Sequence, residues 1–232
     1  MLSTIIKRGA MKRIGLLAAA SVVGATTILL GSGSAAAAGG PIPIGGGSGI
    51  LITHGSNYTN ACTVATIGHD AAGDLVGLTG ARCGGAGQRV LSEVWQDRGR
   101  IGVITYSNPV LNYAVIKFDP NVVIPVNSVG GITIRGIDPA PGPGQIVCKT
   151  GRTMGTNCAW TWQSDAVGHT TQLCVAPGDT GAPVVAGDRL VGMVTGFAVL
   201  ACITPETGTN IGTILSNAGR NGSLVGFRPI GT

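Results

Sequence analysis

Many short β-type runs, separated by glycine-rich turns, constrain the fold of this chain most strongly. Glycine accounts for 40 of the 232 residues. Short strands with frequent glycine turns are typical of a β-sandwich or a β-barrel. A short helix is predicted over 211–218 and a final strand over 224–227. The other predicted strands, rich in β-branched or aromatic residues, are 50–53, 62–67, 75–79, 90–95, 100–106, 113–118, 145–149, 158–163, 170–174, 182–186 and 190–195.

Residues 1–38 have the features of a secretion signal. An apolar run over 14–30 follows a basic region, and Ala35–Ala38 supplies small residues for cleavage. Cleavage is therefore expected near Ala38, with Gly39 as the first residue of the secreted chain. The alternative is an uncleaved membrane anchor, because 17 apolar residues lie at the short limit for crossing a bilayer. The basic region consists of Lys7, Arg8, Lys12 and Arg13.

Charge and cysteine content limit the possible cellular location of the protein and its possible binding partners. The formal charge is +5, but four of the 15 Lys and Arg residues lie in the leader. The remaining 11 nearly balance the 10 Asp and Glu residues, so the composition does not support nucleic-acid binding. All six cysteines follow the leader, which predicts three disulfides and an oxidising location. We therefore expect a secreted, extracellular or cell-envelope protein, which meets the membrane only if the leader is not cleaved.

Glycine and proline divide the chain into segments. Residues 39–49 form a glycine-rich lead that we expect to be flexible or loosely docked. Two strand-rich segments follow, 50–125 and 144–232, and each has the length of one small β-barrel. The intervening 126–143 is predicted to be a linker, since five prolines occur between Asp119 and Gly144.

Residues 177–184 read P-G-D-T-G-A-P-V. This stretch resembles the nucleophile loop of the chymotrypsin-like serine proteases, whose usual form is P-G-D-S-G-G-P. Three further blocks, 78–84, 111–116 and 147–155, occur in the family's order and resemble those of its bacterial streptogrisin and α-lytic protease branch. The resemblance covers nearly all of the chain after the leader. It implies an all-β fold of two antiparallel Greek-key β-barrels with a short C-terminal helix.

The resemblance also implies pairs of residues that lie together. Six cysteines allow 15 pairings, and the family pattern selects Cys62 with Cys83, Cys148 with Cys158, and Cys174 with Cys202. Asp179 is expected to be a buried carboxylate that needs a cationic partner. Lys149 is the candidate for that partner, and Arg152 is the alternative.

The resemblance places Arg82, Asn112 and Thr180 at the three positions of the catalytic triad. A guanidinium stays protonated and cannot accept the proton of a nucleophile. An amide carries no charge that would stabilise an imidazolium. A threonine hydroxyl is chemically usable, but its methyl group crowds attack. Hydrolysis by the family mechanism is therefore expected to fail.

The three histidines are the remaining candidates for a base. His54, His69 and His169 each lie beside glycine or aspartate, and we interpret all three as solvated turn residues. No zinc-binding motif of the H-E-x-x-H or paired C-x-x-C type occurs, so neither a metal site nor a cofactor is expected.

Other parts of the family's cleft are partly retained. The backbone N–H groups of Gly178 and Thr180 lie where an oxyanion hole would form, although the turn itself explains their presence. Thr195, Gly196 and Phe197 match the strand that lines the specificity cleft. Phe197 replaces a glycine, so its ring either fills the pocket or turns outward onto the surface. Trp160 and Trp162 alternate on one strand and are interpreted as packing residues.

Retained fold blocks with altered triad positions predict a secreted protease homologue without catalytic activity. Its expected role is to bind a peptide or an envelope protein through the former cleft or the loops at its rim. Two alternatives stay open. One is an active secreted serine-type endopeptidase with a non-standard site, and the other is a structural envelope protein that does not use the cleft.

Overall fold

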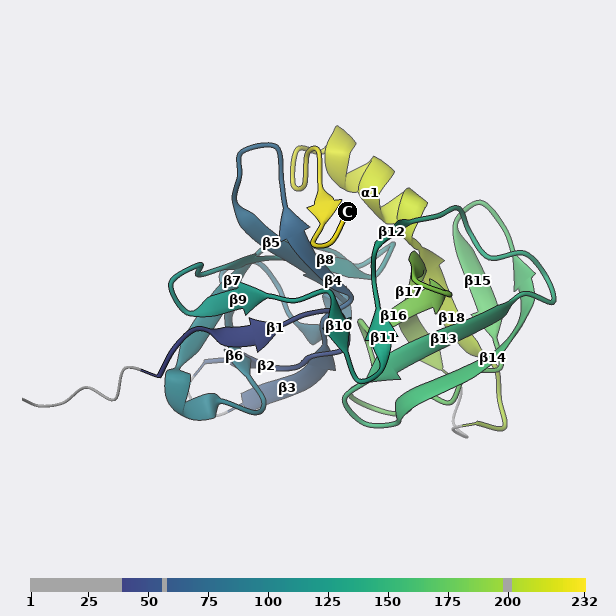
Figure 1. The fold of residues 1–232 in the computed structure, drawn as a ribbon, viewed down its shortest axis with the longest axis horizontal. Helices are drawn as coiled ribbons and strands as arrows, with labels where there is room; N and C mark the ends of the chain where they lie inside the picture. The colour runs from purple at the N-terminus through teal and green to yellow at the C-terminus, as the bar shows by residue number, and fades with distance from the viewer. Residues whose placement is uncertain (1–38, 56–57, 198–201) are drawn as a thin grey trace, which may run out of the picture. The chain divides into compact units, whose positions relative to one another are not determined.

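Antiparallel strands make up most of the fold, and they form one large sheet in each half of the chain (Figure 1). The computed structural model describes residues 39–55, 58–197 and 202–232. The predicted secretion signal over 1–38 lies outside the described residues. No helix within those residues is both long and apolar enough to cross a membrane.

The N-terminal sheet has the strand order β19-β4-β5-β8-β7-β6-β2-β3. Strand β3 runs almost directly into β4, because only residues 64–65 separate them. The chain itself therefore joins β3 to β4 and closes a ring of strands, on which β19 pairs outside β4. The bounds are β2 Gly49–His54, β3 Tyr58–Thr63, β4 Thr66–His69, β5 Leu75–Thr79, β6 Arg89–Ser92, β7 Arg100–Asn108, β8 Tyr113–Phe118 and β19 Arg228–Pro229.

The C-terminal sheet has the order β12-β17-β16-β13-β14-β15-β18, and β18 also pairs with β17. That additional pairing closes a six-strand barrel, whose order around the ring repeats that of the N-terminal half. The prediction of an all-β fold with two antiparallel Greek-key barrels is confirmed. The bounds are β12 Gly136–Ile137, β13 Ile146–Gly151, β14 Gly155–Ser164, β15 Gly168–Thr171, β16 Pro183–Ala186, β17 Arg189–Phe197 and β18 Glu206–Asn210.

Helix α1 (Ile211–Arg220) follows β18 and confirms the predicted C-terminal helix. Its buried side chains, Ile211, Ile214 and Ala218, recur every three or four residues and so lie on one face. That face belongs to an apolar cluster that also contains residues of both sheets, among them Val76 from β5 and Leu190 from β17. Burial of apolar surface therefore holds the two halves and the helix together.

The lead and the linker are more ordered than the composition predicts. Strand β1 (Ile42–Ile44) pairs in parallel with β9 (Val123–Pro125), and Ile42 and Ile44 are buried. The lead is thus docked, and the expectation of a loose start was wrong. The segment 126–143 contains the hairpin of β10 (Ser128–Val129) and β11 (Ile132–Thr133), and it also contains β12, which pairs with β17.

Two predicted strands are also misplaced. The run 62–67 spans the end of β3 and the start of β4, because the chain bends there. Residues 224–227 are not a strand, and the pairing with β4 begins only at Arg228.

Candidate functional site

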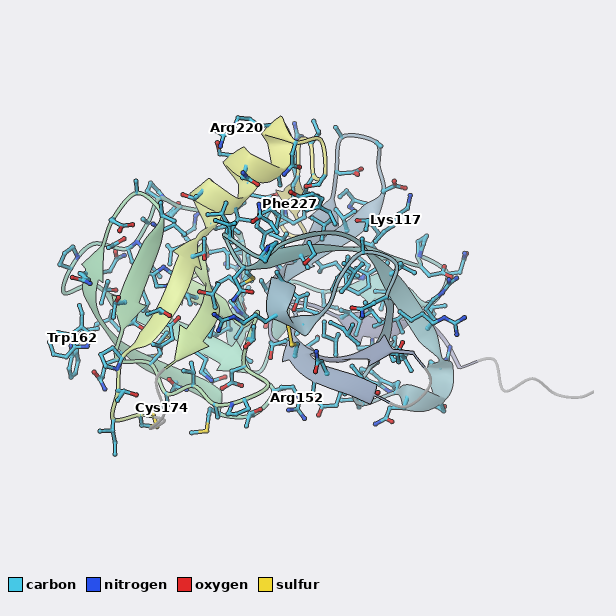
Figure 2. The ribbon with its side chains drawn as sticks, turned by 180° about the vertical axis from the view of Figure 1, so that it is seen from behind. Lys117, Arg152, Trp162, Cys174, Arg220 and Phe227 are labelled. Atoms are coloured by element: carbon cyan, nitrogen blue, oxygen red, sulfur yellow. A yellow bond between two sulfur atoms is a disulfide. The ribbon has the colours of Figure 1, made fainter. Side chains whose placement is uncertain are left out.

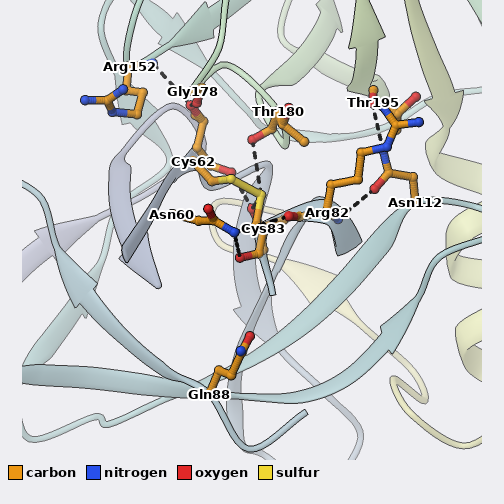
Figure 3. Close-up of a disulfide and its surroundings, with 12 residues drawn as sticks. Asn60, Cys62, Arg82, Cys83, Gln88, Asn112, Arg152, Gly178, Thr180 and Thr195 are labelled. Carbon is orange, nitrogen blue, oxygen red and sulfur yellow. Dashed lines mark hydrogen bonds between the residues drawn. A yellow bond between two sulfur atoms is a disulfide. The ribbon is translucent and has the colours of Figure 1, made fainter. Parts of the chain in front are cut away.

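The three triad-equivalent residues come from three separate connections. Arg82 lies in the short helix η1 (Ala81–Cys83) after β5, Asn112 precedes β8, and Thr180 lies in the loop between β15 and β16. The disulfide between Cys62 and Cys83 fixes η1 to strand β3. Figure 3 shows these residues around that disulfide.

Asn112 connects two of the predicted positions through its amide. Its Oδ1 accepts a hydrogen bond from the backbone N–H of Arg82 at 3.0 Å, and its Nδ2 donates to the carbonyl oxygen of Thr195 at 2.7 Å. The residue is 7% exposed and has φ of +49°, a region in which asparagine is favoured. An amide satisfies both partners at once, whereas an ionised carboxylate has no donor for Thr195.

Arg82 is exposed, and its side chain extends toward Thr195 in Figure 3. Its Nη1 lies 4.0 Å from the position that a Cβ atom on Gly196 would occupy. Within the described residues, no acidic side chain forms an ion pair with it. The structure therefore brings Arg82 and Asn112 together beside the strand of the predicted cleft, and it adds a positive charge there.

Thr180 lies in a loop that is held tightly to the N-terminal half. Its carbonyl oxygen accepts from the N–H of Thr63 at 3.0 Å, and the hydroxyl of Thr63 donates to the carbonyl of Gly178 at 2.9 Å. Gly178 and Gly181 have φ of +103° and +91°, which glycine adopts without strain. Among hydrogen bonds within the described residues, the N–H groups of Gly178 and Thr180 have no acceptor, as an oxyanion-hole nest requires.

Asp179 is paired as predicted. Its Oδ2 lies 2.9 Å from Nζ of Lys149, and both side chains are fully buried. The carboxylate also accepts backbone N–H bonds from Thr153, Met154 and Ala176. A buried charge is tolerated only with such partners. The alternative partner, Arg152, forms an ion pair with Glu93 of the other half instead.

All three predicted disulfides are present: Cys62–Cys83, Cys148–Cys158 and Cys174–Cys202. No free cysteine occurs in the described part of the chain. The covalent framework therefore agrees with the pairing that the resemblance selects.

The prediction for His169 was wrong. Its side chain is 3% exposed inside the C-terminal barrel, where Nδ1 lies 2.9 Å from Oδ1 of Asn210. Burial lowers the pKa of His169, although the bond to Asn210 opposes that effect. Strand β15 places positions 169 and 171 inward, and this alternation was the overlooked signal. His69 is exposed at the end of β4 as expected. The side chain of His54 is not among those that the structure describes.

Sequence reasoning also missed Glu206, which lies fully buried on β18. Its Oε2 accepts a bond of 2.6 Å from the hydroxyl of Thr171. Burial raises the pKa of Glu206 to about 8, against smaller opposing effects of that bond and of the nearby Lys149. Its position among threonine, glycine and asparagine residues gave no apolar pattern that would predict burial.

The predicted specificity residues lie on one strand, β17, which pairs with β18. The carbonyl of Thr195 is occupied by Asn112, as above, and Gly196 faces the hydroxyl of Thr207. The side chain of Phe197 is not among those described, so both alternatives, a ring that fills the pocket and a ring turned outward, stay predictions. Four cavities of about 310 to 640 Å³ lie elsewhere, and none of them is lined by the three triad-equivalent residues.

Trp160 and Trp162 lie on the outer face of the C-terminal barrel and are 46% and 52% exposed. Their rings meet edge to face at 5.7 Å, and Trp162 lies at the margin of the molecule in Figure 2. They are therefore not core residues, and their contact with each other is a surface pairing.

Comparison with solved structures supports the fold. No protein-family model and no curated protein sequence matches the chain. A Nocardiopsis protease is 25% identical with a TM-score of 0.62, over 76% of this chain and 96% of the other. A chymotrypsin of Cellulomonas bogoriensis is 24% identical with a TM-score of 0.60, over 82% and 100%. An α-lytic protease homologue, N4, is 23% identical with a TM-score of 0.62, over 77% and 98%. The chain is thus a structural relative of the bacterial chymotrypsin-like serine proteases, in the streptogrisin and α-lytic protease branch.

Proposed function

We propose that this chain is an extracellular protease homologue without hydrolytic activity that binds a ligand through the former cleft. The observation that carries the proposal is the hydrogen bonding of Asn112, which joins Arg82 to Thr195. A triad requires a base beside the nucleophile and a carboxylate behind the base. At the positions that the resemblance assigns to the base and the carboxylate, this chain has a permanently charged guanidinium, Arg82, and a neutral amide, Asn112.

Three disulfides support an extracellular location, since such bonds persist in oxidising compartments. The pairing of Asp179 with Lys149 holds the loop, and the N–H groups of Gly178 and Thr180 have no acceptor among the described residues, which supports the proposal. A retained shape with altered chemistry favours binding over turnover. The expected ligand is an extended peptide or an envelope protein, whose backbone would lie along Thr195 and Gly196.

Equilibrium binding of peptides from denatured casein to the oxidised full-length protein tests the binding role. Replacement of Arg82 by alanine is expected to weaken binding about tenfold, because a charged hydrogen-bond donor leaves the cleft. Arg220→Ala is the matched control, since Arg220 is exposed on α1, and it should leave binding unchanged. Equal binding by all three proteins would instead favour a structural envelope protein that does not use the cleft.

A further inference from the structure

Unpaired positive charge is concentrated in one segment of the N-terminal half. Residues 39–232 contain 11 Lys and Arg side chains, and five of them form ion pairs within the described residues. Three of the other six, Arg89, Arg98 and Arg100, come from the single segment that runs from β6 through η2 (Gln96–Arg98) into β7. The remaining three are Arg82, Arg220 and Arg228.

Arg89 and Arg100 lie on the same outer face of the sheet. Arg100 is opposite Leu91 in the antiparallel pairing of β6 with β7, and Arg89 lies two residues from Leu91. The register shifts between Val90 and Leu91, so the regular diagonal spacing does not apply here, but Arg89 and Arg100 line the same cavity and can contact one bound chain. Both arginines are exposed.

These two arginines line one open cavity of about 640 Å³. Its other lining residues are neutral: Thr53, Gly55, Gly87, Gln88, Leu91 and Gly99. Three of these residues are glycines and have no side chain that would occupy the cavity, so the cavity stays open to solvent. Arg98 donates to the carbonyl groups of Gly39 and Gly40, and within the described residues it forms no ion pair.

Neighbouring acidic groups do not cancel this charge. Asp97 is exposed in η2, and Asp119 lines an adjoining cavity of about 310 Å³ with Arg100 and Lys117. Lys117 is paired with Asp74 at 2.6 Å, so that pair is neutral. Among the described residues, neither Asp97 nor Asp119 forms an ion pair with Arg89 or Arg100.

We propose that the cavity between Arg89 and Arg100 binds phosphate groups of a phosphate-bearing polymer. An arginine guanidinium presents parallel N–H donors whose spacing matches phosphate oxygens. Two guanidinium groups on one open face of the sheet can bind successive phosphate groups of a polymer that lies across the strands. An enclosed pocket would instead favour a small molecule. The site is separate from the cleft at Thr180 and does not depend on the function proposed for it.

Binding of linear polyphosphate to the oxidised full-length protein, followed by calorimetry, tests this proposal. The double variant Arg89→Gln/Arg100→Gln is expected to bind about tenfold more weakly than the unmodified protein. Arg220→Gln/Arg228→Gln removes the same net charge from exposed, unpaired arginines elsewhere and should bind within about twofold of the unmodified protein. Affinity should also fall about tenfold between about 50 and about 200 mM salt, as two cationic contacts predict.

Three results would overturn the proposal. The first is absence of polyphosphate binding at low salt. The second is equal weakening in both double variants, which would show a diffuse charge effect. The third is equal affinity for poly-L-glutamate, which would show a carboxylate site.

Inorganic phosphate alone should bind far more weakly than polyphosphate, because a single phosphate group cannot contact the arginines as several linked groups do. Unchanged thermal unfolding of both variants would establish that each remains folded.

Discussion

At the scale of single residues, the hydrogen bonds of Asn112 determine which side chain suits position 112. Its two amide ends face opposite kinds of partner, an N–H group of Arg82 and a carbonyl group of Thr195. The position therefore favours an amide over the carboxylate that hydrolysis would need.

Asn112→Asp tests this directly. The substitution sets an ionised oxygen against the Thr195 carbonyl, so the free energy of unfolding should fall by about 1–3 kcal/mol in urea titrations at neutral pH. Aspartate tolerates positive φ nearly as well as asparagine, so backbone strain does not confound the result. Gln96→Glu changes an exposed amide that also donates to a carbonyl, and it should cost less than about 0.5 kcal/mol. Similar losses in both variants would contradict this account.

The buried pair of Lys149 and Asp179 carries a second prediction. Lys149→Met leaves the carboxylate of Asp179 without its cation inside the barrel, and should cost about 3–5 kcal/mol of unfolding free energy. Lys117→Met is the control, because Lys117 is 52% exposed beside Asp74, and it should cost less than about 1 kcal/mol. Chemical denaturation measures both, and equal costs would refute the assignment of Asp179 as a buried, dependent charge.

At the scale of elements, strand β3 fixes the nucleophile loop to the N-terminal half. The Thr63 hydroxyl donates to Gly178 and accepts from the N–H of Arg152 at 3.2 Å. Thr63→Val keeps the shape but removes both bonds, and a loss of about 1–3 kcal/mol is expected on urea unfolding. Thr133→Val, on the surface hairpin of β10 and β11, should change stability by less than about 0.5 kcal/mol. An unaffected Thr63→Val protein would show that the loop is held by other contacts.

Elements with strong apolar or β-branched patterns were predictable from the sequence. Strands β5 and β8 have the predicted bounds, since each is almost wholly buried and its residues favour extended structure. Strand β18 was missed because its sequence, ETGTN, is polar although four of its five residues are buried. Its buried polar side chains find partners far away in the chain, such as Thr171 for Glu206 and the carbonyl of Leu111 for Thr209, which no local pattern reveals.

The candidate site was predictable wherever the resemblance supplied a residue. The disulfides and the pairing of Lys149 with Asp179 are examples, because the family's blocks placed both members of each pair. The bonds of Asn112 were not predictable, since they depend on a carbonyl of β17 that lies 83 residues away in the chain. The shared cavity of Arg89 and Arg100 was not predictable either, because it depends on how strands β6 and β7 pair.

At the scale of the whole molecule, Glu206 links stability to pH. Burial raises its pKa from 4.5 to about 8, so the folded state keeps a proton that the unfolded state releases. The stability from this group is full below about pH 4.5 and is lost as pH rises toward 8, by up to about 1.4 kcal/mol per unit. The lowered pKa of His169 acts in the opposite direction.

Glu206→Gln separates these effects. The variant should match the unmodified protein near pH 5 and exceed it in unfolding free energy near pH 8, as measured by urea denaturation at both values. Thr171 can still donate its hydroxyl to the amide oxygen. A difference between the two proteins that does not change with pH would contradict the protonated state of Glu206.

We propose that this protein does not hydrolyse peptide bonds, and incubation of the oxidised protein with a fluorophosphonate probe and with casein measures this activity. Because Arg82 cannot act as a base and Asn112 carries no negative charge, we expect no covalent label on Thr180 and no casein cleavage above background. Stoichiometric labelling of Thr180 together with casein turnover that is lost in Thr180→Ala would contradict it.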